Sequence, residues 1–149
     1  MALPATPVVL DTNIVLDLFI FKDAQAQTLS KALSQSKFSW LATAAMREEL
    51  ERVLAYPKIA KRMAFYEIPA QEILEKFDAG THTVEVPAKA SATCKDPDDQ
   101  KFIDLAVAHS AILLSKDQAV LCMAKRLSAL GVIYTGPACA VKSALPQLF

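Results

Sequence analysis

Two aspartates follow short apolar runs that are typical of buried strands. Asp11 comes directly after Val8–Leu10, and Asp117 comes shortly after Ala111–Leu114. In parallel sheets the functional crevice lies beyond the carboxyl ends of the strands, so we expect both carboxylates at one sheet edge. Each also has a purely structural explanation, because Asp11 can be an ordinary polar residue at a strand end and Asp117 can complement a helix dipole.

A third acidic segment, Asp-Pro-Asp-Asp at residues 96–99, is expected to open a helix. Helix capping alone can explain it, because its first Asp suits the N-cap, its Pro the first helical position and its last Asp a capping box. Helical spacing aligns Asp99 with Ile103 and Asp98 with Phe102. Spacing therefore leaves the choice between these two acids open.

A fourth acid, Glu49, lies on the inward stripe of an expected helix. It comes three residues after Met46 and four before Val53, whereas Glu48 points about a quarter-turn away. A buried carboxylate needs a partner. Because no Lys or Arg recurs on this stripe, we expect a metal or a hydrogen-bond network beside Glu49.

Carboxylates grouped in this way suit phosphodiester hydrolysis. Their hard oxygen atoms hold Mg²⁺ or Mn²⁺ and leave coordination positions open for water and phosphate. The metal lowers the pKa of its bound water, screens the phosphate from the carboxylates and stabilises charge on the leaving oxygen. The sequence is compatible with one ion or two.

Four segments of the chain, in this order and spacing, resemble the PIN domain, in particular its toxin-like prokaryotic branch. They are Val9–Asn13, Arg47–Leu54 with Pro57-Lys58, Cys94–Phe102 and Leu113–Asp117. The resemblance spans roughly residues 8 to 137. It implies a metal-dependent ribonuclease that cleaves single-stranded RNA and is often the toxin of a toxin-antitoxin pair.

The resemblance also assigns site residues. The family's metal-binding acids correspond to Asp11, Glu49, Asp99 and Asp117. Asn13 and Ser115 match polar positions that support these acids. Asp98 is expected to contact the metal ligands, not the metal itself, and so to orient them. Lys116 and Gln118 depart from the pattern, since relatives commonly carry a Gly or an acidic residue beside the last acid.

The apolar patterns predict how these residues are positioned: an α/β fold of three layers, α/β/α, around a parallel sheet of four to five strands. Residues 1–149 are expected to form a single PIN-like domain. Strands are expected at 8–10, 38–41, 83–86, 111–114 and 132–134. Helices are expected at 14–21, around 29–33, from 43 to a turn at 57, and at 58–63, 69–77, 96–109, 117–130 and after 137.

Composition limits the function classes. The chain is 53% hydrophobic, and its 16 basic and 16 acidic residues give a formal net charge of +0, so RNA binding must be local. The first residues do not resemble a secretory signal and no run is long enough to span a bilayer, so we expect a cytoplasmic protein without membrane contact. Cys94, Cys122 and Cys139 are expected to be buried thiols, because their spacing indicates neither disulfides nor a zinc site.

A basic stretch lies near two aromatic residues, Tyr56 and Phe65. It consists of Arg47, Arg52, Lys58, Lys61 and Arg62. These cations can follow an RNA backbone while an aromatic ring stacks on a base. A solvated helix face is the alternative. The candidate RNA contacts are Arg52, Lys58, Arg62 and Lys116.

The remaining titratable residues are expected to stay outside the site. His82 and His109 lie away from the acidic motifs and are not expected to act as general bases. Surface or capping positions are expected for Asp17, Asp23, Asp78 and Asp104. The apolar tail at 138–149 is expected to pack on the body or to form a dimer contact.

The leading hypothesis is a Mg²⁺- or Mn²⁺-dependent endoribonuclease acting on single-stranded RNA, with a cognate antitoxin or a second copy of the chain as candidate protein partners. One alternative is a small-molecule phosphohydrolase of haloacid-dehalogenase type with Asp11 as nucleophile. Asn13 argues against it, because that chemistry usually requires a second Asp there. Another alternative is a catalytically silent PIN-like module that binds RNA or protein.

Overall fold

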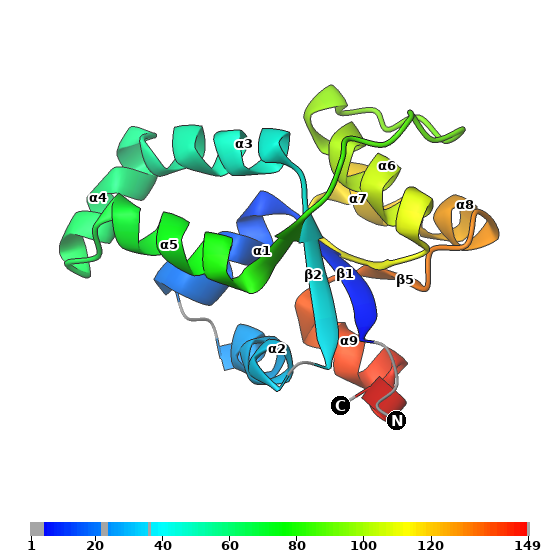
Figure 1. The fold of residues 1–149 in the computed structure, drawn as a ribbon, viewed down its shortest axis with the longest axis horizontal. Helices are drawn as coiled ribbons and strands as arrows, with labels where there is room; N and C mark the ends of the chain where they lie inside the picture. The colour runs from blue at the N-terminus through cyan, green and yellow to red at the C-terminus, as the bar shows by residue number, and fades with distance from the viewer. Residues whose placement is uncertain (1–4, 22–23, 36, 149) are drawn as a thin grey trace.

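The computed structural model describes residues 5–21, 24–35 and 37–148. The described chain is built on a five-stranded parallel sheet in the order β3-β2-β1-β4-β5 (Figure 1). The strands are β1 (Thr6–Leu10), β2 (Phe38–Ala42), β3 (Thr81–Thr83), β4 (Ile112–Leu114) and β5 (Tyr134–Gly136). The expected α/β fold with a central parallel sheet is confirmed.

Helices flank this sheet. They are α1 (Thr12–Leu16), α2 (Ala24–Ser34), α3 (Ala44–Leu54), α4 (Pro57–Phe65), α5 (Ala70–Gly80), α6 (Gln100–His109), α7 (Gln118–Leu121), α8 (Ala124–Ala129) and α9 (Ala138–Ala144). Helix α6 packs on β1 and β4, whereas α2 packs on β2 and α9 on β5. Strands covered in this way are apolar along their whole length, as β4 is, since all its residues are buried.

The two central strands bring distant parts of the sequence together. Leu10 of β1 is paired with Leu114 of β4, and the Asp11 amide donates a 3.0 Å hydrogen bond to the Leu114 carbonyl. The chain segments that follow these strands therefore leave the sheet side by side. This is the placement that the sequence predicted for Asp11 and Asp117.

Helices α3, α4 and α5 form an arm on one side of the sheet, at the left of Figure 1. Thr43 occupies the N-cap position of α3, as expected, but its side chain makes no capping hydrogen bond. Pro57 does more than end α3, because it is the first residue of α4, where its fixed φ and missing N–H are tolerated. Three helices thus separate β2 from β3, as predicted.

The strand expected at 83–86 is misplaced, because β3 covers Thr81–Thr83 and residues 84–96 contain no helix or strand. Helix α5 ends at Gly80, where an added Cβ would lie 3.2 Å from the ring of Trp40. This close approach allows the chain to pass from α5 directly into pairing with Trp40 and its neighbours on β2. The bounds of β3 are therefore determined by its pairing with β2, which the spacing of apolar residues in the sequence does not reveal.

The strand expected at 132–134 also lies too early, because β5 is Tyr134–Gly136. Val132 belongs to the end of α8 instead: its amide bonds to the Leu127 carbonyl at 3.1 Å, and its side chain is buried. Gly131 has a φ of +98°, as a helix-terminating residue in a left-handed conformation requires. In the sequence pattern, an apolar residue that closes a helix end therefore resembles the start of a strand.

Two expected helices are continuous in the sequence pattern but not in the fold. The helix at 117–130 is divided into α7 and α8 at Cys122 and Met123, where the Met123 amide bonds three residues back to Val120. The helix at 14–21 consists of α1 followed by a π-helical turn, Asp17–Phe21. Apolar spacing is similar in all these forms, so it did not distinguish them.

The three cysteines differ in exposure, and the C-terminal helix packs on the body of the protein. Of the three thiols only Cys94 is buried, whereas Cys122 and Cys139 are exposed, so the expectation of three buried thiols is wrong. Helix α9 packs on α2 and β5. Within the described residues, no helix combines the length and apolar character needed to cross a membrane.

Candidate active site

The acidic residues singled out in the sequence meet at the carboxyl ends of β1 and β4. Asp11 caps α1 immediately after β1, and Asp117 caps α7 after β4, each accepting a hydrogen bond from the amide two residues ahead. Asp99 ends the 3₁₀ turn Pro97–Asp99 that leads into α6. Glu49 approaches from α3 on the arm. Capping and convergence on one site therefore coexist.

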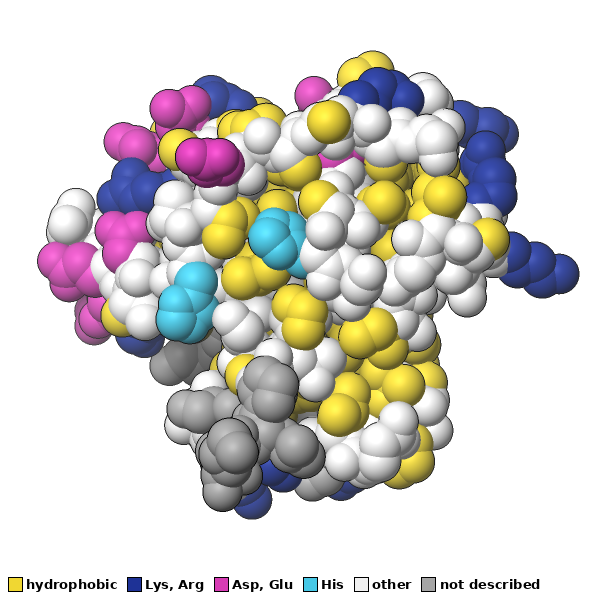
Figure 2. Space-filling view, turned by 45° about the vertical axis from the view of Figure 1, so that its right-hand side comes forward, with side chains coloured by type: hydrophobic (Ala, Val, Ile, Leu, Met, Phe, Trp, Pro, Cys, Tyr) yellow, Lys and Arg dark blue, Asp and Glu magenta, His cyan; other side chains and the backbone are white. Residues whose placement is uncertain are grey.

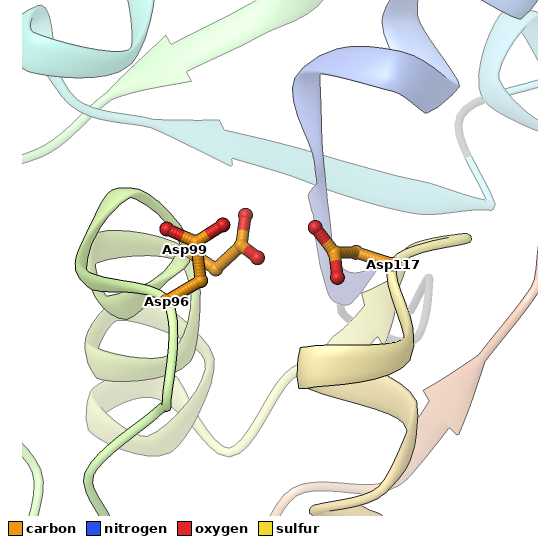
Figure 3. Close-up of side chains that lie close together, drawn as sticks. All are labelled: Asp96, Asp99 and Asp117. Atoms are coloured by element: carbon orange, nitrogen blue, oxygen red, sulfur yellow. The ribbon is translucent and has the colours of Figure 1, made fainter.

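Two of these side chains, Asp99 and Asp117, form a compact group with a further carboxylate, that of Asp96, as Figure 3 shows. One carboxylate oxygen from each of Asp96, Asp99 and Asp117 lies within 4.8 Å of the other two. Asp99 is only 7% exposed, and its Oδ2 atom is buried without a hydrogen-bond partner in the described structure. A buried carboxylate oxygen with no donor is costly unless something else satisfies it.

Asp11 is held by polar groups from both neighbouring segments. Its Oδ2 accepts a 2.6 Å hydrogen bond from the hydroxyl of Ser115, and its Oδ1 accepts the Asn13 amide at 3.3 Å. The same Ser115 oxygen accepts the amide of Asp117 at 3.0 Å. Fully buried Ser115 thus connects the two aspartates, whereas Asn13 contributes through its backbone and is exposed.

Glu49 has a basic partner that the sequence analysis missed. Lys101 of α6 donates to its Oε1 at 3.0 Å, and the Thr12 hydroxyl donates to its Oε2 at 2.6 Å. Spacing within α3 does not indicate this partner, because the lysine comes from another helix. It stands two residues after Asp99, inside the segment that carried the family resemblance, and that proximity was the available signal.

Burial and mutual repulsion shift the acid equilibria of this site. Burial raises the pKa of Asp11, and the charges of Glu49 and Asp117 raise it further against the hydrogen bonds that lower it. Burial, the contact with Asp117 and the charge of Asp11 raise the pKa of Asp99 to about 8. The carboxylates therefore share one negative field, which a divalent cation would relieve.

The structure distinguishes the two acids that helical spacing left open. Asp99 points into the site, whereas Asp98 is exposed and contacts its neighbours through its backbone: its amide donates to Asp96 and its carbonyl accepts Lys101. The capping box expected for this turn does not form, because among the described residues no hydrogen bond joins the Asp96 amide to the Asp99 side chain, whose Oδ2 has no partner. Asp96 is the N-cap, as predicted, but it also belongs to the compact group, which the sequence analysis did not foresee.

Of the acids assigned to surface or capping positions, Asp78 is exposed and pairs with Arg47. Asp17 is instead buried and forms a 2.7 Å ion pair with Lys116, so that assignment is wrong. Asp104 is half-buried and accepts hydrogen bonds from the Ala90 amide and from the Gln100 side chain. Asp23 lies outside the described residues.

The basic stretch lies on the arm. Lys58, Lys61, Arg62 and Phe65 of α4 line an open groove, and in the described part of the chain none of these three cations has a salt-bridge partner within 4.0 Å. Phe65 is 76% exposed. Arg52 is exposed on α3, whereas the ammonium of Lys116 is engaged by Asp17. Both histidines are exposed and appear in cyan on the face shown in Figure 2.

The donor set fits a hard divalent cation. It consists of carboxylate oxygens, including the buried, unpartnered Oδ2 of Asp99, which are the ligands that Mg²⁺ and Mn²⁺ prefer. Free cysteine thiols and histidines, which softer metals prefer, are absent from the compact group. The arrangement can therefore bind a cation and present it to a phosphate.

Comparison with known families agrees with this geometry. A family profile described as the PIN domain matches residues 7–119, which is well over half of the chain and includes all five carboxylates of the site. No curated protein matches the chain. PIN domains are generally metal-dependent nucleases. From its sequence, its parallel sheet and its acidic cluster, the chain belongs to the PIN domain family.

Proposed function

We propose that the protein is a metal-dependent endoribonuclease that cleaves single-stranded RNA, with Asp11, Glu49, Asp99 and Asp117 as its catalytic acids. The observation that carries the proposal is the position of Asp11 and Asp117 beside Asp99, whose buried Oδ2 has no hydrogen-bond partner in the described structure. Glu49 lies close enough to Asp11 to raise its pKa. Folding alone does not favour bringing mutually repelling carboxylates together from remote parts of the sequence. The binding of a cation does favour it.

The supporting residues act by fixing the acids. Ser115 holds Asp11 through its hydroxyl and Asp117 through the Asp117 amide, so both carboxylates keep one orientation. Thr12 and Lys101 hold Glu49 in the same way from two other elements. When bound, Mg²⁺ or Mn²⁺ would supply an activated water and stabilise charge on the leaving oxygen.

The α4 groove supports a single-stranded substrate. Lys58, Lys61 and Arg62 offer positive charge to the phosphates, and exposed Phe65 offers a ring on which a base can stack. In duplexes the bases are already stacked and paired, and their faces are not available to Phe65. The arm that carries this groove also carries Glu49, so the proposed RNA contacts and one of the acids belong to the same group of helices.

Cleavage of a labelled single-stranded RNA tests this function. We expect internal cleavage with Mn²⁺ or Mg²⁺, none with excess chelator, and a loss of at least about a hundredfold in Asp99→Asn. Asp98→Asn is the matched control, because Asp98 lies in the same turn but is exposed, and it should retain activity. Equal cleavage by wild type and Asp99→Asn, or cleavage that survives chelation, would remove the proposal. A duplex and a single-stranded DNA of the same sequence serve to test the substrate class.

The biological role that we propose is that of the toxin in a toxin-antitoxin pair, acting on cytoplasmic RNA. It is supported by the four sequence segments that resemble the toxin-like branch of the family. Induced expression should arrest growth, and co-expression of a small protein encoded beside the gene should relieve the arrest. Arrest that persists in Asp99→Asn would show that the effect is not ribonuclease activity. The oligomeric state, including a homodimer, is tested by light scattering on the same preparations.

A further inference from the structure

The five carboxylates of the site differ in what their oxygens already bind. Asp11 accepts hydrogen bonds on both oxygens, from Ser115 and from the Asn13 amide. Glu49 is also engaged at both, by Thr12 and by Lys101. Among the described residues, Asp96 and Asp117 by contrast each accept one backbone hydrogen bond, on Oδ1, and Asp117 also contacts the side chain of Asp99. Two of the five acids thus accept hydrogen bonds on both carboxylate oxygens, whereas the other three do not.

The three acids that do not accept hydrogen bonds on both oxygens are also the three that lie together. Their ligand atoms fall within 4.8 Å of one another, and Mg²⁺ or Mn²⁺ with oxygens at about 2.1 Å requires ligand separations of about 2.9 to 4.2 Å. Small side-chain rotations suffice to close that difference. The oxygen without a partner, Oδ2 of Asp99, belongs to this group and is buried, which gives the group an unmet need for a cation.

At Glu49 a positive charge is already built into the protein. The Lys101 ammonium bonds to Glu49 at 3.0 Å and to the Asp98 carbonyl at 2.6 Å, so its position is fixed from two sides. It also lies 5.1 Å from the centre of the Phe102 ring. A second metal ion at Glu49 would have to displace this ammonium and tolerate its charge nearby.

We infer that this site holds a single cation, bound by Asp96, Asp99 and Asp117, and that Lys101 takes the place of a second cation at Glu49. Asp96 is then a metal ligand as well as a helix cap. Asp11 and Glu49, held by their own hydrogen bonds, would orient water at the bound ion. The inference rests on the proposed metal-dependent function and specifies how this chain carries it out.

Binding of Mn²⁺ alone, followed by calorimetry and by the electron paramagnetic resonance of free Mn²⁺, tests the inference without an activity assay. Wild type should bind one ion. Asp96→Asn retains a cap acceptor and should bind Mn²⁺ at least about tenfold more weakly, whereas Asp98→Asn should stay within about twofold. If Asp96→Asn does not fold, as judged by circular dichroism, Asp96→Ser replaces it, since serine also caps.

Lys101→Met tests the second half of the inference. Methionine retains the length of the side chain without its charge, so a second, weaker Mn²⁺ should appear in this variant. Two ions in wild type, unchanged affinity in Asp96→Asn, or a single ion in Lys101→Met would each overturn the inference while metal-dependent cleavage still stood. No Mn²⁺ binding in wild type would instead overturn the proposed function itself.

Discussion

The residue with the least ordinary environment in this protein is Asp99. Its carboxyl is buried, repelled by Asp11 and Asp117, and left with an oxygen that nothing in the described structure satisfies. The sequence supplied Asp99 through a family resemblance, and helical spacing alone could not separate it from Asp98. Burial separates them, and burial depends on how α6 packs against β1 and β4, which spacing within one helix does not report.

Asp99→Asn should stabilise the metal-free protein. The pKa of Asp99 is about 8 in the folded protein and near the ordinary aspartate value of 3.8 in the unfolded chain, so ionisation opposes folding increasingly as the pH rises from about 4 to about 8. In chelator, the melting temperature of Asp99→Asn should exceed that of wild type by at least about 2 °C at pH 8, and the difference should shrink toward pH 5. Asp98→Asn should show no such trend. If Asp99→Asn melts below wild type at pH 8, ionised Asp99 does not destabilise the metal-free protein and its pKa is not raised by burial and repulsion as described.

Ser115 is expected to matter for stability as well as for the site. Ser115→Ala removes the donor to Asp11 and the acceptor of the Asp117 amide, leaving buried polar groups unpaired. We expect the free energy of unfolding in urea to fall by about 1–3 kcal/mol. Ser128→Ala, at an exposed position on α8, should change it by less than about 0.5 kcal/mol. Equal effects of both substitutions would argue against the bridging role of Ser115.

At the level of helices and strands, the sequence predicted the order and type of most elements. It did not predict the residues at which an element begins or ends where pairing with another strand or capping of a helix decides them. Strand β1 was found because its apolar run is continuous, and α6 because Pro97 and its flanking acids mark a helix start. Strand β5 was misplaced because Val132 closes α8 instead of pairing with β4. Such choices depend on contacts between elements, which a local pattern does not contain.

One element-scale contact has a direct test. The segment 84–96, which has no helix or strand, is attached to α6 through Asp104, whose carboxylate accepts the Ala90 amide at 2.9 Å. Asp104→Ala should loosen this segment and speed trypsin cleavage after exposed Lys89 and Lys95 several-fold.

The matched control for that experiment is Asp78→Ala, which breaks an exposed ion pair with Arg47. Exposed pairs contribute little to stability, so cleavage after Lys89 and Lys95 should keep the wild-type rate. If both variants are cleaved alike, or neither differs from wild type, Asp104 does not secure the segment.

At the scale of the whole molecule, a net charge of +0 conceals a separation of charge. Acids gather at the ends of β1 and β4, while on α4 gather an exposed ring and cations that form no salt bridge with the described residues. Composition alone therefore excluded a general polycation without locating the RNA-binding surface. The fold supplies the location, because the arm places α4 and Glu49 of α3 on one projecting unit (Figure 1).

Binding of single-stranded RNA in chelator should depend on the α4 groove. Phe65→Ala should weaken binding about tenfold by removing a stacked base. Lys58→Ala and Lys61→Ala together should reduce the slope of log affinity against log salt by about 1.4, or about 0.7 per phosphate contact. Lys125→Ala, an exposed lysine on α8, is the control and should leave the affinity unchanged. Equal losses from Lys125→Ala would show that the attraction is not localised on the arm.

Diffraction from Mn²⁺-soaked crystals shows directly whether these remote acidic residues converge to bind a hard cation. We expect an anomalous peak within about 2.3 Å of carboxylate oxygens of Asp99 and Asp117, with Asp96 as the third protein ligand. Crystals saturated with Mn²⁺ that show no peak among these carboxylates would contradict this expectation.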